Sequence, residues 1–131
     1  MTAKSWHWLS EALLLAVHEA QLAEHGGLSG FRDIGLLQSA LARAPNRAAY
    51  GDADAASLAA CYAFGIARNP PFNDGNKRMA LLAAEVFLLD NGYGLAASDA
   101  EVYKAIIGLA DGALDEDAFA GWLRSNIRPA G

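Results

Sequence analysis

Basic residues are scarce in this sequence. Ten Lys and Arg stand against fifteen Asp and Glu in 131 residues, which gives a net charge of -5 and a pI near 5.0. Proteins that bind DNA or RNA directly need clustered Lys and Arg against phosphate, so the charge argues against a nucleic-acid partner. A chain of this length buries roughly 70% of its unfolded surface and folds without metal or disulfide staples. We therefore expect a single domain over residues 1–131.

Cysteines and long apolar runs are also lacking. Cys61 is the single cysteine, so no disulfide forms within the chain, and its Ala, Tyr and Phe neighbours indicate a buried thiol. A secretory signal needs an unbroken apolar stretch near the N-terminus, where Trp6, His7 and Glu11 stand instead. No window of membrane-spanning length is free of charges. We therefore expect a soluble cytoplasmic protein without a membrane partner.

Apolar residues recur at spacings of three and four, the pattern of amphipathic helices. The first predicted helix runs toward His25 on a stripe formed by Trp6, Leu9, Leu13, Ala16 and Ala20. A second, shorter helix is expected over residues 34–43, with its end before Pro45. Near the C-terminus, residues 98–101 predict a capping box that begins a helix through Ala110.

Two segments, residues 55–68 and 79–89, are apolar on nearly every face, which is typical of central helices. With a last helix from Asp115 to about Ile127, the sequence predicts an all-α bundle of about six helices. Residues 93–96 and 26–32 are the candidates for a short hairpin or flap.

The two apolar segments are joined by polar residues 69–75, which Pro70 and Pro71 make non-helical. A polar loop held by a rigid core is where function concentrates. Gly75 permits a tight turn, and the helix that begins after it presents unpaired N–H groups and a positive dipole end, which together form an anion site. This loop is therefore the main candidate for a functional site.

The side chains around this helix start suit polyphosphate. The Asn76 amide, the Lys77 ammonium and the Arg78 guanidinium add donors and two positive charges. Asp74 is an oxygen ligand for Mg²⁺ beside them. A purely structural interpretation stays open, in which Asp74 caps the helix and pairs with Arg78 while Lys77 is solvated. The crowding of polar residues between two very apolar helices favours function without naming a reaction.

Residues 69–78, Asn-Pro-Pro-Phe-Asn-Asp-Gly-Asn-Lys-Arg, resemble the Fic superfamily signature His-x-Phe-x-Asp/Asn-Gly/Ala-Asn-Lys/Gly-Arg. Six of its seven informative positions match. Residues 26–28, 32–33, 36–45 and 86–123 also resemble death-on-curing (Doc) type members. The resemblance covers nearly the whole chain and implies a compact Fic/Doc helical bundle.

The resemblance implies a role for each motif residue. Phe72 would anchor the loop in the core, Asp74 would hold Mg²⁺, and Arg78 would clamp phosphate. The nucleotide, ATP, would be bound by Asn73, Gly75, Asn76, Lys77 and Arg78. The catalytic set would be Asp74, Asn76, Lys77, Arg78 and the position that Pro70 occupies.

Lys77 bears on the type of transfer. Fic proteins that transfer AMP usually have Gly at this position, whereas Doc has Lys, which implies transfer of the γ-phosphoryl group. The resemblance then implies a kinase toxin of a type II toxin-antitoxin module that modifies a threonine of elongation factor Tu and stops translation. Its antitoxin, Phd, would cover the site with a C-terminal segment. An AMP transferase and an inactive module that binds nucleotide or antitoxin are the alternatives.

Pro70 departs from the signature at the histidine that serves the family as general base. Loss of a general base typically costs about 10² to 10⁴ in rate, so we expect an inactive or impaired form. The fold should be spared, because any residue before Pro71 is already restricted to extended geometry. Either a natural member has lost activity, or the change was selected or chosen so that a lethal toxin could be produced without its antitoxin. The intact remainder of the signature favours the second origin.

The three histidines invite two further hypotheses. His7, His18 and His25 lack the i,i+4 spacing of a helical metal pair, so we expect no metal site from them. His18 or His25 would replace the missing base only if the fold brought it to the loop. Residues 26–32 lie in the part of the chain where Fic relatives have a flap that docks the target, and an ordinary connection between two helices is the alternative. A groove between this loop and the motif would suit an antitoxin helix.

Overall fold

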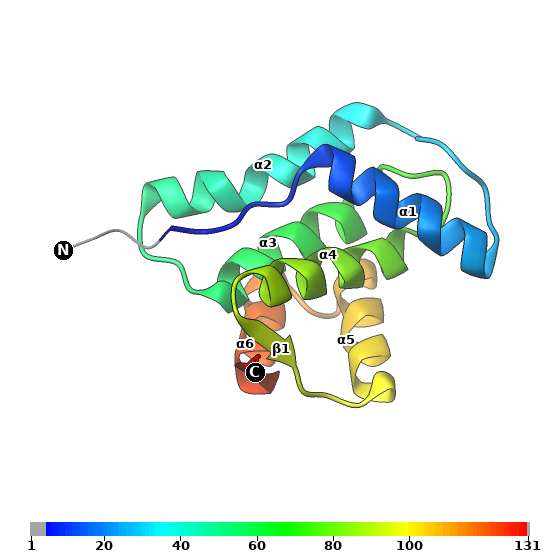
Figure 1. Cartoon of the computed structure of the whole chain (residues 1–131). Helices are drawn as coiled ribbons and strands as arrows, with labels where there is room; N and C mark the ends of the chain where they lie inside the picture. The colour runs from blue at the N-terminus through cyan, green and yellow to red at the C-terminus, as the bar shows by residue number, and fades with distance from the viewer. Residues whose placement is uncertain (1–4, 131) are drawn as a thin grey trace.

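The computed structural model describes residues 5–130, in which six helices dominate (Figure 1). The elements are α1 Glu11–His25, α2 Ile34–Tyr50, α3 Ala55–Arg68, α4 Asn76–Asp90, β1 Tyr93–Leu95, α5 Asp99–Asp111, α6 Glu116–Asn126 and β2 Ile127–Pro129. The predicted all-α bundle of about six helices is confirmed. Across residues 5–130, every helix is too short or too polar to cross a bilayer.

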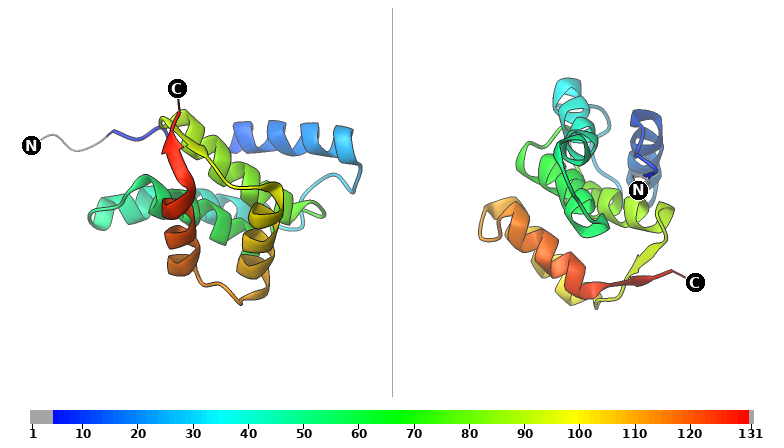
Figure 2. Two further views of the ribbon diagram at one scale, coloured as in Figure 1. Left: turned by 90° about the horizontal axis from the view of Figure 1, so that it is seen from below. Right: turned by 90° about the vertical axis from the view of Figure 1, so that its left-hand side faces the viewer.

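Helices α3 and α4 form the middle of the molecule. The pair α1 and α2 lies on one side of them, and α5, α6 and the two strands lie on the other (Figures 1 and 2). Twelve of the fourteen residues of α3 are buried, and α4 buries Met79, Ala80, Ala83, Ala84, Phe87 and Leu88. Alanine on almost every face lets α3 contact α2, α4, α5 and α6. The prediction of two central helices is confirmed.

The N-terminus of α4 differs from those of the other helices. Five helices in the described chain begin with a side chain that accepts a first-turn N–H, supplied by Ser10, Asp33, Asp54, Ser98 and Asp115. The predicted capping box at Ser98 and Glu101 is among them. Helix α4 instead follows Gly75, a left-handed residue at φ 76°, and has no side-chain cap. Its first-turn N–H groups therefore stay available to an external acceptor.

Helix α1 begins later than predicted and turns a different face to the core. It begins at Glu11, because the Ser10 hydroxyl accepts the N–H of Leu13 and ends the extended segment before it. Its buried residues are Leu14 and His18, whereas Leu13 is 37% exposed. The predicted stripe was therefore wrong by one position, because it counted the non-helical Trp6 and Leu9 as part of the helix.

Helix α2 continues through Pro45, where the sequence predicted its end. An internal proline removes one hydrogen bond and costs about 3 kcal/mol. The apolar spacing continues past it, because Leu37, Ala40 and Ala44 are buried and Ala48 packs against the core. Packing against α3 thus outweighs the tendency of Pro45 to end the helix.

The two predicted hairpin segments pair with distant parts of the chain. Strand β1 is antiparallel to β2, with Leu95 opposite Ile127, so its partner is the C-terminal segment. Residues 26–32 contribute one isolated bridge, from Phe31 to Phe72. Phe72 lies in the loop of residues 69–75, which we call the motif loop. The expected short strand pairing is therefore present at residues 93–95, and its distant partner could not be predicted, because strands this far apart leave no turn signal in the sequence.

We predict that Gly65→Ala destabilises the fold although alanine is the better helix former. A Cβ at Gly65 would lie 2.9 Å from the Cβ and 3.0 Å from the Cα of Ala40 in α2. Because backbone stands in the way, overpacking should lower the free energy of unfolding by about 1–3 kcal/mol. Urea denaturation followed by circular dichroism measures this change.

Gly121→Ala in α6 is the matched control, since a Cβ there meets no atom within 4 Å. It should leave the free energy of unfolding unchanged or raise it by about 0.5–1 kcal/mol. If Gly65→Ala stabilised the protein as Gly121→Ala does, the close approach of α2 and α3 would be wrong.

Candidate functional site

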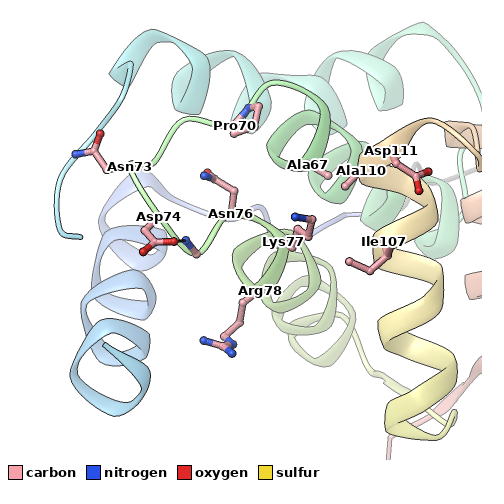
Figure 3. Close-up of a pocket in the computed structure, with 11 residues that line it drawn as sticks. Ala67, Pro70, Asn73, Asp74, Asn76, Lys77, Arg78, Ile107, Ala110 and Asp111 are labelled. Atoms are coloured by element: carbon pink, nitrogen blue, oxygen red, sulfur yellow. Dashed lines mark hydrogen bonds between the residues drawn. The ribbon is translucent and has the colours of Figure 1, made fainter. Parts of the chain in front are cut away.

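One cleft collects the predicted site residues (Figure 3). It has a volume of about 830 Å³ and lies between the end of α3, the loop of residues 69–75, the start of α4 and the end of α5. The predicted residues that line it are Pro70, Asn73, Asp74, Gly75, Asn76, Lys77 and Arg78. Ala67, Ile107, Ala110 and Asp111 complete the wall and were not predicted.

Phe72 lies under the cleft and holds the loop to the core. Its side chain is 1% exposed and stacks against His18, with ring centroids 4.0 Å apart, and against Phe31 at 5.7 Å. The Asn76 side chain accepts the Phe72 N–H and donates to the Phe72 carbonyl, both at 3.0 Å. The loop is therefore fixed at Phe72, both by the ring of this residue and by its backbone N–H and carbonyl.

A second segment, residues 26–33, lies along the motif loop, and we call it the flap segment. The Arg32 N–H donates to the Pro71 carbonyl at 2.8 Å, and the Asn73 N–H donates to the Gly30 carbonyl at 3.1 Å. The Asn73 side chain adds a bond to the carbonyl of Ser29 at 2.9 Å. Asn73 thus connects the two loops in this structure, and its role at a nucleotide stays a prediction.

The start of α4 supplies the positive side of the cleft. Lys77 and Arg78 are both exposed. Figure 3 shows Lys77 directed toward α5 and Arg78 directed to the opposite side. An anion at the uncapped helix terminus would meet backbone N–H groups first, with one cation on each side.

The Asp74 carboxylate is held by backbone N–H groups. Its Oδ1 accepts the N–H of Gly75 at 2.9 Å, and its Oδ2 accepts the N–H of Leu28 at 3.3 Å. A Cβ on Gly27 would lie 2.9 Å from Oδ2, and Gly27 has φ 121°, so only glycine fits there. None of the ion pairs within residues 5–130 includes Asp74 or Arg78, and the cap position is Gly75. Of the purely structural alternative, the Asp74 cap and its ion pair with Arg78 therefore do not form in the described chain, whereas the exposed Lys77 does agree with it.

Asp74 is a carboxylate that would lie beside a magnesium ion bound at the start of α4. Across residues 5–130, His, Cys, Asp and Glu side chains form no cluster of three that would hold a metal unaided. Mg²⁺ is usually bound by one or two carboxylates, with phosphate oxygens and water as the other ligands. The residues present therefore fit a cation that arrives with a polyphosphate.

Pro70 lines the cleft without offering a titratable group. Its carbonyl accepts the Arg32 Nε–H at 2.8 Å, which ties this position to the flap segment. None of the three histidines lines the cleft. His18 contacts the loop from behind, with its Nε2 3.0 Å from the Asp74 carbonyl oxygen, but its side chain is only 3% exposed. It does not face the position of a substrate as a substitute base.

Asp111 is an acidic residue of the cleft that sequence reasoning missed. It ends α5, and its Oδ1 accepts the Ala113 N–H at 2.8 Å. No motif links residue 111 to the loop at 69–75, so only the packing of α5 beside α3 and α4 reveals it. The cleft therefore has a carboxylate on the wall opposite Lys77.

Cys61 takes no part in this chemistry. It is 2% exposed in α3, as its neighbours predicted, and burial raises the pKa of its thiol to about 12. The thiolate, which is the nucleophilic form, is therefore essentially absent at neutral pH.

We predict that Asn76→Ala loosens the motif loop, because the N–H and the carbonyl of Phe72 lose their partners. Leaving partly buried backbone groups unpaired should lower the free energy of unfolding by about 1–3 kcal/mol. The Phe72 amide should also exchange hydrogen faster. Asn73→Ala, which removes one exposed bond to Ser29, is the control and should change both quantities less. Equal effects of the two variants would show that Asn76 does not brace the loop.

Comparison with known proteins agrees with the geometry. Residues 8–88 match the Fic/DOC family. The chain is also 35% identical over 117 residues to "Protein kinase doc" of Escherichia phage P1, an alignment that covers 88% of this chain and 92% of that protein. A family match over more than half of the chain, and a relative aligned over nearly its full length, leave one conclusion. The chain belongs to the Fic/DOC family.

Proposed function

We propose that the cleft binds ATP with Mg²⁺ and that the chain is a Doc-type kinase toxin whose phosphoryl transfer is impaired by Pro70. The observation that carries the proposal is the uncapped N-terminus of α4, which lies between the carboxylate of Asp74 and the side chains of Lys77 and Arg78. Five other helix starts in the described chain are closed by a side chain. The N-terminus of α4 has no such side chain, so its N–H groups can bind a ligand.

The triphosphate is the part of ATP that this terminus recognises. Backbone N–H groups and the helix dipole attract phosphate oxygens, and the guanidinium of Arg78 suits two-point contact with them. Lys77 adds a point charge on the side of α5. Asp74 would hold the magnesium ion, which would supply positive charge against the phosphates. Asn73, Gly75 and Asn76 complete the binding set of the motif.

Transfer of the γ-phosphoryl group is the reaction that we favour. The hydroxyl oxygen of a threonine bonds to the γ-phosphorus, the bond from that phosphorus to the bridging oxygen breaks, and ADP leaves. The hydroxyl proton needs an acceptor. Two observations support a kinase: Lys77 at the position where AMP-transferring members usually have Gly, and a relative named "Protein kinase doc". Elongation factor Tu, a cytoplasmic protein, is the proposed target, and loss of translation the proposed effect.

Pro70 removes the proton acceptor from this scheme. It stands at the signature's histidine, lines the cleft and has no ionisable atom. Phosphoryl transfer depends mainly on positioning and on charge stabilisation, which the remaining residues supply. The protein should therefore bind Mg²⁺-ATP almost normally while its transfer rate is reduced about 10²- to 10⁴-fold.

An antitoxin segment of the Phd type is the proposed partner. The flap segment and the start of α2 expose three large apolar side chains: Leu28 at 69%, Phe31 at 37% and Ile34 at 39%. Exposed apolar residues gathered beside a functional loop mark an interaction surface. An amphipathic C-terminal helix of an antitoxin would cover them and close the cleft.

Arg78→Ala should weaken Mg²⁺-ATP binding roughly 10- to 100-fold, because one charge-assisted phosphate contact contributes about 1.5–3 kcal/mol. Isothermal titration calorimetry measures the affinity. Lys104→Ala removes the same charge from an exposed position of α5 outside the cleft and should leave the affinity unchanged. Equal affinities of the Arg78→Ala variant and the unaltered protein would refute the nucleotide site.

Pro70→His should restore activity, because an imidazole with a pKa of about 6.5 then stands where the threonine hydroxyl approaches. Label from γ-labelled ATP should appear on elongation factor Tu about 10²- to 10⁴-fold faster than with the unaltered chain. Pro70→Gln, which cannot accept a proton at neutral pH, is the control. Label from α-labelled ATP would indicate AMP transfer instead. If no protein were labelled and cells without antitoxin grew normally, the kinase proposal would fall. The remaining alternative would be an inactive module that binds nucleotide or antitoxin.

A further inference from the structure

His18 is a buried histidine, one of the few buried side chains in the described chain that carry a polar group. It lies on α1, far from the motif in sequence, and is 3% exposed. Its ring is nearly parallel to that of Phe72, with an interplanar angle of 17° and centroids 4.0 Å apart. The ring thus has a packing role, but the position of its nitrogen suggests a second role.

The His18 Nε2 lies 3.0 Å from the backbone carbonyl oxygen of Asp74. A carbonyl oxygen can only accept, so the imidazole carries its proton on Nε2 and donates it. The bond fixes the direction of the Asp74 carbonyl at the point where the chain enters the left-handed turn at Gly75.

The same peptide group reaches the Asp74 carboxylate. The carbonyl of Asp74 and the N–H of Gly75 belong to one planar trans peptide, so they point in opposite directions. That N–H donates to Oδ1 of the Asp74 side chain at 2.9 Å. By fixing the direction of the Asp74 carbonyl, His18 therefore also fixes the direction of the Gly75 N–H. That N–H in turn fixes the position of one carboxylate oxygen of Asp74.

We infer that His18 is a positioning residue that orients the Asp74 carboxylate toward the magnesium ion of bound Mg²⁺-ATP. The inference rests on the proposed function. His18 acts through the peptide between Asp74 and Gly75 and does not line the cleft, so it touches neither nucleotide nor target. Residues that orient a metal ligand through a hydrogen bond typically change metal affinity 10- to 100-fold when they are removed.

Two substitutions of His18 separate its role as a hydrogen-bond donor from the packing role of its ring. His18→Phe keeps an aromatic ring to stack on Phe72 and removes the hydrogen bond to the Asp74 carbonyl. His18→Gln loses the ring and keeps an amide N–H that reaches a similar distance along the side chain. A role in packing alone predicts that phenylalanine is the milder change, whereas the positioning role predicts the reverse.

The test is titration of ATP into the unaltered chain and both variants, once with Mg²⁺ and once with EDTA. The measured quantity is the ratio of the two affinities, which reports how much the metal contributes. We expect that His18→Phe lowers this ratio roughly tenfold or more while the affinity in EDTA stays nearly constant. His18→Gln should recover most of the ratio. Melting temperatures of all three proteins report any loss of folding separately.

Two results would overturn the inference alone: an unchanged ratio in His18→Phe, or an equal loss of affinity with and without Mg²⁺. In both cases the unaltered chain would still bind Mg²⁺-ATP, and the proposed function would stand. If the unaltered chain bound ATP no better with Mg²⁺, both proposals would fall. Should His18→Phe not fold, His18→Leu against His18→Gln makes the same comparison without a ring in either variant, and equal ratios would again overturn the inference.

Discussion

The site depends on how α4 begins without a capping side chain. Gly75 takes the left-handed turn, and Asn76, the first residue of the helix, binds back to the N–H and the carbonyl of Phe72. These bonds brace the loop from within, so that no cap residue is needed where a ligand would bind. The stacked rings of Phe72 and His18 anchor the same loop to α1. Local geometry thus keeps first-turn N–H groups open at a position that is otherwise rigid.

Three distant segments meet on this loop. Helix α1 contributes His18 behind it, the flap segment runs beside it, and α5 forms the opposite wall of the cleft with Asp111. The flap segment also donates the Leu28 N–H to the Asp74 carboxylate. A partner that displaces the flap segment would therefore alter the same carboxylate that is proposed to hold magnesium. Under the proposed function, docking of a target or an antitoxin and binding of nucleotide would be coupled through these contacts.

The sequence predicted the elements whose signals are local. The apolar α3 and α4, the capping box at Ser98 and the loop between Pro70 and Gly75 all follow from neighbouring residues. The errors arose where distant packing decides the outcome. Helix α2 passes through Pro45 because α3 supports it, and the partner of β1 is a distant C-terminal strand that the sequence did not indicate. The contact of His18 with the Asp74 carbonyl and the place of Asp111 were hidden for the same reason.

The proposed function requires that the first turn of α4 receives the phosphates of Mg²⁺-ATP. Backbone amide shifts in ¹⁵N–¹H spectra, recorded as Mg²⁺-ATP is added to the unaltered chain, test it most directly. We expect the largest shifts at Gly75, Asn76, Lys77 and Arg78. Smaller shifts are expected at Asp74 and at Leu28, whose N–H donates to the Asp74 carboxylate. Large shifts confined to another part of the molecule, or no shifts at millimolar nucleotide, would contradict it.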